Sequence, residues 1–244
     1  MEEFRFKHFS VRNSSSAMKV GTDGVLLGAA MALPREGGRL LDIGSGTGVI
    51  ALIAAQRLSL SPAAPPFHIT AIDIDLASAE EAAASFAASP WASNLTSLHA
   101  SLAGFAGSEP GSVRFDAIFS NPPYFEDSLR NPDPREAAAR HTSGLSYRDI
   151  LSFASVRLNP GGSLSLILPA EAETPLGRCA SSFGLRMFRI LRIRGTDRKP
   201  FSRIIAEFRR SDAPLPLQEV ELTLMEDGKR SAAYAALTED LYLY

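Results

Sequence analysis

Short apolar runs alternate along the chain with longer segments in which apolar residues recur at helical spacing. The short runs predict buried strands, and the longer segments predict helices that cover them. The predicted strands span residues 39–43, 68–72, 95–99, 115–120, 163–168, 185–193 and 204–208. The predicted helices span residues 18–32, 49–58, 78–88, 147–158 and 170–183. This alternation favours an α/β fold with a doubly wound, mostly parallel sheet of seven strands.

The last two predicted strands, 185–193 and 204–208, are joined by a connection too short for a crossover helix. One strand of the sheet is therefore expected to be antiparallel. The rest of the C-terminal tail predicts a strand and then a short helix over residues 234–241. We expect a single domain over residues 1–244, with an N-terminal extension, 1–20, and a tail, 211–244, packed on it.

Composition narrows the class of protein. The formal net charge is −2, so a nucleic-acid partner would have to be met by a local basic patch. The single cysteine, Cys179, excludes a disulfide framework and a multi-cysteine zinc site, and we expect no metal. The chain start does not resemble a signal peptide, and no apolar run approaches membrane-spanning length. We expect a cytoplasmic protein with no membrane contact and no obligate protein partner.

A glycine-rich loop follows the first predicted strand and opens the second predicted helix. It contains Asp42, Gly44, Ser45, Gly46 and Gly48. Glycines let a backbone fold closely under a ligand. The third glycine comes one position earlier than in the dinucleotide pattern Gly-x-Gly-x-x-Gly, and no Gly-Lys-Ser/Thr phosphate loop is present. The acidic Asp42 would repel a pyrophosphate but suits a cationic ligand amine.

A second acidic residue, Asp73, ends the strand 68–72, where it can accept hydrogen bonds from ribose hydroxyls. The loop and Asp73 together resemble the S-adenosylmethionine (SAM) pattern of class I methyltransferases, which implies a Rossmann-like fold and SAM as cofactor. The alternative is a tight turn in another α/β protein. Asp75 has the alternative role of capping the next helix. Ser101 stands where many such enzymes have an acidic residue near the cofactor adenine.

The strand 115–120 ends in an unusual turn made of Asn121, Pro122, Pro123 and Tyr124. Proline has no N–H to donate, so the strand ends here and the next residues project from its carboxyl end, where ligands bind in such sheets. A Pro-rich turn without a function is the alternative. After a glycine loop and an acidic strand end, however, the turn resembles the amino-group methyltransferases, which act on adenine, guanine or glutamine amines.

The chemistry of amine methylation explains the residue types. A planar exocyclic amine is a poor nucleophile because its lone pair is delocalised. The carbonyl oxygens of Asn121 and Pro122 can accept both amine hydrogens and direct the lone pair towards the methyl group. Tyr124 offers a face on which a flipped-out base can stack, and Phe125 is expected to wall the pocket, with core packing as its alternative.

Motifs at both ends of the chain narrow the substrate. Residues 4–9, 17–29 and 233–243 resemble the bacterial tRNA-valine adenine-N6 methyltransferases, and further matches occur in residues 89–92, 115–124 and 135–142. That family modifies the adenosine just 3′ of the anticodon, so the resemblance implies tRNA as partner. It also implies that Thr22 and Asp23 lie near the methionine end of the cofactor, with helix capping as the alternative. Candidate substrate contacts are Phe125, Arg130, Arg135, Arg140, His141, Arg189, Arg192, Arg194, Arg198, Lys199 and Arg203.

Three other functions stay open from the sequence. Glutamine-N5 methylation of a protein uses the same Asn-Pro-Pro-Tyr turn, but those enzymes carry a helical substrate domain that has no counterpart before the glycine loop here. Guanine-N2 methylation of ribosomal RNA is the second. A non-catalytic module that binds SAM or RNA is the third, and the intact Asn121 and Tyr124 argue against it.

Overall fold

The computed structural model describes residues 3–14, 16, 19–60, 65–123, 145–212 and 214–243. Their helices and strands, in chain order, are β1 (Glu3–Arg5), β2 (Ser10–Arg12), α1 (Thr22–Ala30), β3 (Gly38–Ile43), α2 (Val49–Ser59), β4 (Phe67–Asp73), α3 (Leu76–Ala87), η1 (Ala92–Asn94), β5 (Leu95–His99), α4 (Leu102–Ala106), α5 (Glu109–Ser112), β6 (Phe115–Ser120), α7 (Tyr147–Arg157), β7 (Leu158–Pro169), η3 (Ala170–Ala172), α8 (Glu173–Ser182), β8 (Leu185–Thr196), β9 (Arg203–Arg210), β10 (Gln218–Glu226), β11 (Lys229–Arg230) and α9 (Ala232–Leu237).

The main sheet has the strand order β11-β10-β8-β9-β7-β6-β3-β4-β5, while β1 and β2 form a separate hairpin. The strands from β7 to β5 in this order are parallel to one another. Strand β9 runs antiparallel to both of its neighbours, which confirms the expected antiparallel strand. The described part of the sheet has nine strands instead of the predicted seven.

The two additional strands come from the C-terminal tail. Strand β10 pairs with β8 in parallel, and the short β11 pairs with β10 in an antiparallel hairpin. Leu222 is buried in the core, and Val220 and Leu224 pack against it, so β10 has an apolar face that the sheet can cover. The predicted number of seven strands was therefore too low, because this apolar face lets the strand expected in the tail extend the sheet itself.

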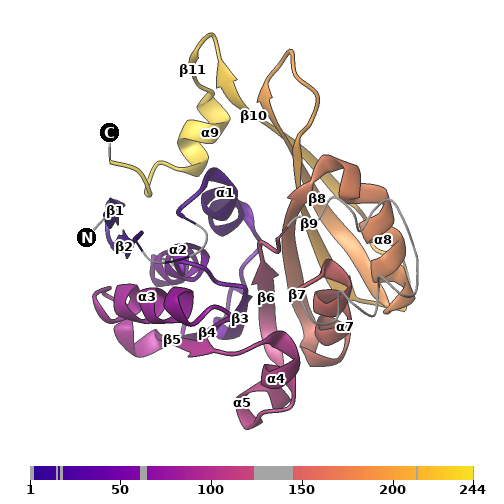
Figure 1. Ribbon diagram of the computed structural model, residues 1–244. Coiled ribbons are helices and arrows are strands. Elements are labelled where there is room, and N and C mark those ends of the chain that lie inside the picture. Colours follow the sequence, from indigo (N-terminus) through magenta and orange to yellow (C-terminus); the bar gives the residue numbers. More distant parts are fainter. Residues whose placement is uncertain are drawn as a thin grey trace.

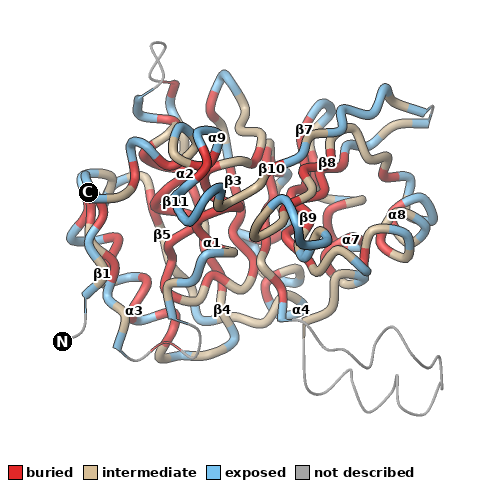
Figure 2. The backbone as a smooth tube through the Cα atoms, turned by 90° about the horizontal axis from the view of Figure 1, so that it is seen from above, coloured by how far each residue is buried: buried red, intermediate tan, exposed pale blue. Residues whose placement is uncertain are grey.

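Helices cover both faces of the sheet. Helices α1, α2 and α3 lie on one side of the strands, and α4, α7 and α8 lie on the other (Figure 1). Successive residues of one strand face opposite sides. Leu40 and Phe119 belong to the core under α1 and α2, whereas their neighbours Leu41 and Ile118 belong to the core under α4, α7 and α8. Figure 2 shows that buried residues concentrate along the central strands.

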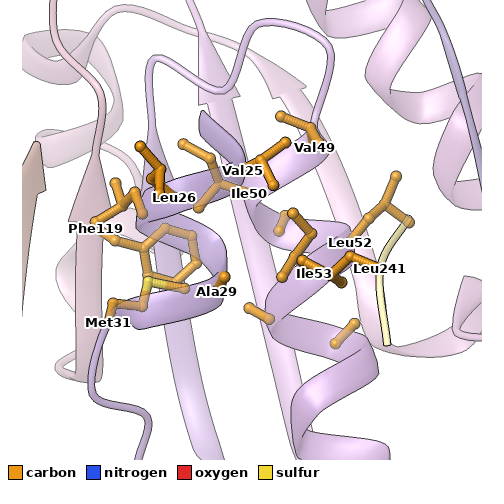
Figure 3. Packing of buried hydrophobic residues seen from close by; sticks show 14 of the residues in the cluster. Val25, Leu26, Ala29, Met31, Val49, Ile50, Leu52, Ile53, Phe119 and Leu241 are labelled. Carbon is orange, nitrogen blue, oxygen red and sulfur yellow. The ribbon is translucent and has the colours of Figure 1, made fainter. Parts of the chain in front are cut away.

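Helices α1 and α2 pack closely against each other above the centre of the sheet. Figure 3 shows Val25 and Leu26 of α1 beside Ile50 of α2, with Phe119 of the sheet below them. A Cβ on Gly28 would lie 2.9 Å from the Cβ of Ile53, so the absence of a side chain permits this close approach. The packing fixes the two helices whose first turns border the candidate site.

The two ends of the chain lie on the same side of the molecule (Figures 1 and 2). Phe6 forms a β-bridge with Tyr242, and the backbone N–H of Lys7 donates to the carbonyl of Leu241 at 2.9 Å. The Gln56 amide of α2 also donates to the carbonyl of Asp240 at 2.9 Å. The extension and the tail therefore contact each other and α2. That the chain functions as one domain stays a prediction.

Candidate active site

The glycine-rich loop joins β3 to α2 at the carboxyl edge of the sheet. Gly44, Gly46 and Gly48 have φ values of +70°, +53° and +78°, a backbone region that favours glycine. A Cβ on Gly48 would lie 2.6 Å from the ring of Phe86, so this position also lacks space for a side chain. The backbone N–H groups of Gly44 and Ser45 donate to the carbonyl of Ile72, at 2.8 and 3.1 Å. The loop is thereby held against the end of β4.

Asp42, the acidic residue before this loop, is fully buried. Within the described part of the chain, neither of its carboxyl oxygens has a hydrogen-bond partner. Burial is the main cause that raises its pKa to about 8, and the nearby carboxylate of Asp73 raises it further. The backbone N–H of Ala51, in the first turn of α2, opposes this rise without forming a hydrogen bond of normal geometry. Asp42 is therefore placed to gain from a cationic ligand group.

Asp73 ends the neighbouring strand β4 and faces the same loop. Its carboxylate accepts hydrogen bonds from the backbone N–H of Gly46 at 2.7 Å and from that of Asp75 at 2.9 Å. Asp75 caps α3, since its carboxylate accepts from the backbone N–H and the hydroxyl of Ser78 at 2.9 and 2.7 Å. The capping alternative for Asp75 is thus confirmed, and these hydrogen bonds lower its pKa.

Asn121 leaves β6 beside the point where the glycine loop leaves β3. The two strands pair in parallel, with Asp42 opposite Phe119. The buried Ser120 hydroxyl donates to the carbonyl of Ile43 at 2.6 Å, which ties the two strand ends together. Sequence reasoning missed this contact, because no local pattern indicates it. Asn121 is half-buried, Pro122 is buried and Pro123 is exposed. Tyr124 and Phe125 lie outside the described residues.

Thr22 and Asp23 begin α1, but neither caps it. Gly21 occupies the N-cap position and has no side chain to offer, so the capping expectation for Thr22 or Asp23 was wrong. Thr22 is exposed. Asp23 instead accepts a hydrogen bond at 2.9 Å from the Nε of Arg203, at the start of β9. Sequence reasoning missed this pair, because the two residues are 180 positions apart.

Ser101 follows β5, the strand next to β4. Its hydroxyl accepts from the backbone N–H of Gly104 at 3.1 Å and caps α4. The preceding residue, Ala100, donates its backbone N–H to the carbonyl of Asp73 at 2.9 Å, so Ser101 lies close to the end of β4. An adenine contact by Ser101 stays a prediction.

The basic residues proposed for tRNA binding fall into three groups. Arg189, Arg192, Arg194 and Arg203 each pair with at least one carboxylate, at 2.5 to 3.7 Å. Arg198 and Lys199 are exposed in the hairpin between β8 and β9. The remaining candidates, Arg130, Arg135, Arg140 and His141, lie outside the described residues.

The residues around the loop fit a ligand that carries both a cation and hydroxyl groups. Four buried side-chain atoms of the described residues have no hydrogen-bond partner, and three of them lie at this loop: both carboxyl oxygens of Asp42 and the hydroxyl of Ser45. Buried polar atoms normally find partners, so atoms left over at one loop indicate a binding site. Among the described residues, no group of three or more metal-ligating side chains occurs, and no helix is long and apolar enough to cross a membrane.

Comparisons with known proteins identify the family. Residues 13–176 match the methyltransferase small domain family. A Photobacterium profundum protein named tRNA1(Val) (adenine(37)-N6)-methyltransferase is 37% identical over 240 residues, which cover 98% of each chain. The chain belongs to the tRNA1(Val) (adenine(37)-N6)-methyltransferase family. Members from Bacteroides fragilis and Flavobacterium johnsoniae, which carry the same name, are 37% and 34% identical and cover 98% of this chain. They are themselves covered over 97% and 99% of their lengths.

Solved structures support the fold of this family member. A protein from Agrobacterium tumefaciens described as a predicted O-methyltransferase has a TM-score of 0.66 at 21% identity, covering 90% of this chain and 96% of that one. The 16S rRNA N2 G1207 methyltransferase of T. thermophilus, solved with AdoMet and guanosine, has a TM-score of 0.56 at 19% identity. It covers 86% of this chain and 50% of its own. The expected Rossmann-like class I methyltransferase fold is confirmed.

Proposed function

We propose that this protein transfers a methyl group from SAM to the exocyclic N6 amine of an adenosine in tRNA. The adenosine is the one 3′ of the anticodon, at position 37 of tRNA1(Val). The observation that carries the proposal is the 37% identity to a family member of that name over 98% of both chains. Because the match covers nearly all of both chains, the relative has no additional domain on which the activity could depend.

The residues at the carboxyl edge support SAM as the cofactor. In our proposal, the glycine loop lies under the methionine part, Asp42 attracts its ammonium group, and Asp73 accepts hydrogen bonds from its ribose. Thr22 and Asp23 border the same end, and Ser101 borders the adenine. When bound, the cofactor supplies an electrophilic methyl group on a sulfonium.

The turn after β6 supports an amine as the methyl acceptor. In our proposal, the side-chain carbonyl of Asn121 and the backbone carbonyl of Pro122 would accept the two hydrogens of an exocyclic amine. The position of both residues at the end of β6, beside the glycine loop, supports this role. Their hydrogen bonds would pull the nitrogen towards tetrahedral geometry. The bound cofactor would supply the methyl group, which the amine nitrogen would take up as the bond from carbon to sulfur breaks, and the amine would then give one proton to water. A strong general base is unnecessary, because the methylated aromatic amine is a weak base.

Residues outside the described part of the chain complete the proposal. Tyr124 and Phe125 would hold the flipped adenine by stacking. Arg135, Arg140 and His141 would face the tRNA beside the active site. Because tRNA is the proposed substrate, we propose the cytoplasm as the place of action.

Labelled methyl transfer tests the function directly. Purified protein would be incubated with methyl-labelled SAM and bulk tRNA from cells that lack the gene. We expect label in N6-methyladenosine of one tRNA, at the position 3′ of the anticodon, when nucleosides and oligonucleotides are mapped by mass spectrometry. Bulk tRNA from cells that carry the gene is the matched control and should accept little label. No label in the adenosine of this tRNA, with label instead when ribosomal RNA or protein from the same cells is offered as the acceptor, would contradict the proposal.

A further inference from the structure

Four of the seven arginines on strands β8 and β9 are neutralised inside the protein. Arg189 contacts Glu207, Arg192 contacts Glu173 and Glu219, Arg194 contacts Glu221, and Arg203 contacts Asp23. Their charges are already compensated, so they have little to offer a polyanion. The other three, Arg186, Arg209 and Arg210, lie at the end of the two strands that is opposite to their connecting hairpin. Within the described residues, Arg198 and Lys199 form no ion pair, and both are exposed.

These two cations occupy the tip of the hairpin that joins β8 to β9. The backbone N–H of Lys199 donates to the carbonyl of Thr196 at 3.1 Å and closes a turn, and Ser202 donates to Ile193 at 2.9 Å just below it. Strand β9 is antiparallel to both β7 and β8, so β8 runs in the same direction as β7. Strand β7 in turn is parallel to β6. The hairpin therefore projects from the same edge of the sheet as the Asn-Pro-Pro turn, above the strands in Figure 1.

Contacts at its base hold the hairpin in place. The guanidinium of Arg194 lies over the ring of Phe201 at 5.1 Å and donates to the hydroxyl of Thr223 on β10 at 2.9 Å. Arg203, at the other end of the connection, reaches Asp23 at the start of α1. The hairpin is thus attached both to the edge of the sheet and to the helix that borders the cofactor loop.

The second hairpin at this edge offers a contrast. Between β10 and β11, two exposed acidic residues, Glu226 and Asp227, balance the two basic ones, Lys229 and Arg230. The guanidinium of Arg230 also lies over the ring of Tyr242 at 4.5 Å. The acidic and basic residues of the β10–β11 hairpin cancel, so this hairpin has no net charge that would attract phosphate. The β8–β9 tip has two cations and one acidic residue, Asp197.

We propose that Arg198 and Lys199 contact the phosphate backbone of the tRNA and hold it beside the active site. The proposal rests on the proposed function, since it takes tRNA as the polyanion. Phosphate contacts position a nucleic acid without reading its sequence. The hairpin therefore contributes affinity and orientation, while the choice of base belongs to the active site. Asp197 opposes the two cations and limits the strength of the contact.

Three variants test the hairpin because their expected effects differ in sign. Arg198→Ala combined with Lys199→Ala should weaken tRNA binding roughly tenfold at moderate salt. Asp197→Asn should strengthen it, since it removes the opposing charge. Arg210→Ala is the matched control, because Arg210 is exposed at the opposite end of β9 and should leave binding unchanged. Binding would be measured by filter retention of labelled tRNA over a range of salt concentrations.

The salt dependence and the kinetics supply independent readouts. Losing two phosphate contacts should reduce the slope of log Kd against log salt by about 1.4 to 1.8. The KM for tRNA should rise, while kcat at saturating tRNA and the Kd for SAM stay at wild-type values. An unchanged slope in the double variant, or an equal loss in Arg210→Ala, would overturn the proposal. Because tRNA binding is measured without methyl transfer, failure of the hairpin proposal is distinguishable from failure of the proposed function, in which wild-type protein methylates no tRNA.

Discussion

The two halves of the sheet differ in the hydrogen bonding of their buried carboxylates. In the half formed by β6, β3, β4 and β5, the buried carboxylate of Asp42 accepts no hydrogen bond from the described residues. In the half that contains β8 and β9, the buried carboxylate of Glu207 accepts from the Arg189 guanidinium, the Ser165 hydroxyl and the backbone N–H of Ala32. An unpartnered buried acid costs stability, whereas a fully satisfied one can contribute to it. The buried carboxylate of the first half therefore needs a ligand as its partner, and we call this the ligand-dependent half. The buried carboxylate of the second half has its partners within the protein, and we call this the satisfied half.

This difference indicates that the first half binds the ligand and that the second half supports the structure around it. The satisfied half also holds the end of α1, because Arg189 donates to the carbonyl of Ala30 at 2.9 Å. Arg57 of α2 donates to the carbonyls of Gly28 and Met31 at the same end of α1. Burial is the main cause that lowers the pKa of Arg57 to about 10, and Glu207 opposes that fall. A rigid second half thus positions α1, whose first turn borders the ligand-dependent half.

Removing the satisfied carboxylate should have the largest effect on stability. Glu207→Ala would leave Arg189, Ser165 and the N–H of Ala32 without their shared acceptor. We expect the free energy of unfolding to fall by about 3–5 kcal/mol, measured by urea denaturation. Glu219→Ala is the control, because Glu219 pairs with Arg192 while 57% exposed and should change stability by less than about 1 kcal/mol. Equal effects of the two variants would remove the contrast between the halves.

Asn121 tests the ligand-dependent half through activity instead of stability. Asn121→Ala should lower kcat by roughly 10²–10³-fold, because one of the two acceptors for the amine is lost. The Kd for SAM should stay near the wild-type value. Asn94→Ala is the control, since its amide donates to the carbonyl of Phe67 at 2.9 Å, at the opposite end of β5. Loss of SAM binding in Asn121→Ala would mean that Asn121 acts on the cofactor and not on the amine.

Asp42 should respond to mutation with the opposite sign from Glu207. Its pKa of about 8 in the folded protein lies above the ordinary value of 3.8. The unfolded chain therefore releases its proton first, and stability is lost as pH rises from about 4 to 8. Asp42→Asn has no such proton to release. Without added SAM, the free energy of unfolding of this variant should therefore rise relative to that of the wild type by roughly 1 kcal/mol per pH unit across that window. Above about pH 8 the difference should level off.

The cofactor should reverse this advantage. An ammonium group near Asp42 favours the ionised carboxylate, so SAM binding to the wild type should release a proton and tighten as pH rises towards 8. Asp42→Asn should bind SAM more weakly and without this pH dependence, as titration calorimetry in buffers of different ionisation enthalpy would record. If the variant were less stable than the wild type at pH 8 without SAM, Asp42 would be a structural residue like Glu207.

The elements that could be predicted from the sequence are those with a local pattern. Strand β3, the glycine loop and α2 follow from a buried run, three closely spaced glycines and an apolar helical segment. The turn after β6 is equally local, since its prolines end the strand. The prediction placed the antiparallel strand by the shortness of one connection, which is also a local property.

Partners distant in sequence could not be predicted in the same way. Glu207 and Ala32 are 175 positions apart, and no periodicity indicates which buried acid meets which backbone donor. The tail was predicted to contain a strand, but no local pattern indicated that this strand, β10, would pair with β8. The short helices α4 and α5 were not predicted, because four or five residues are too few to show helical spacing.

The ion pair between Asp23 and Arg203 joins α1 to β9, and its removal should have the smallest effect. Both side chains are partly exposed, 25% and 35%, so their coupling energy should be below about 1 kcal/mol. Because Asp23 borders the proposed methionine site, Arg203→Ala should weaken SAM binding by up to about fivefold and leave kcat unchanged. In a double-mutant cycle, Arg203→Ala should add little once Asp23→Ala is present, and Arg203→Lys should restore part of the affinity. Additive losses would show that each residue acts separately. A fall in melting temperature without a change in SAM affinity would show that this contact does not position the ligand-binding residues.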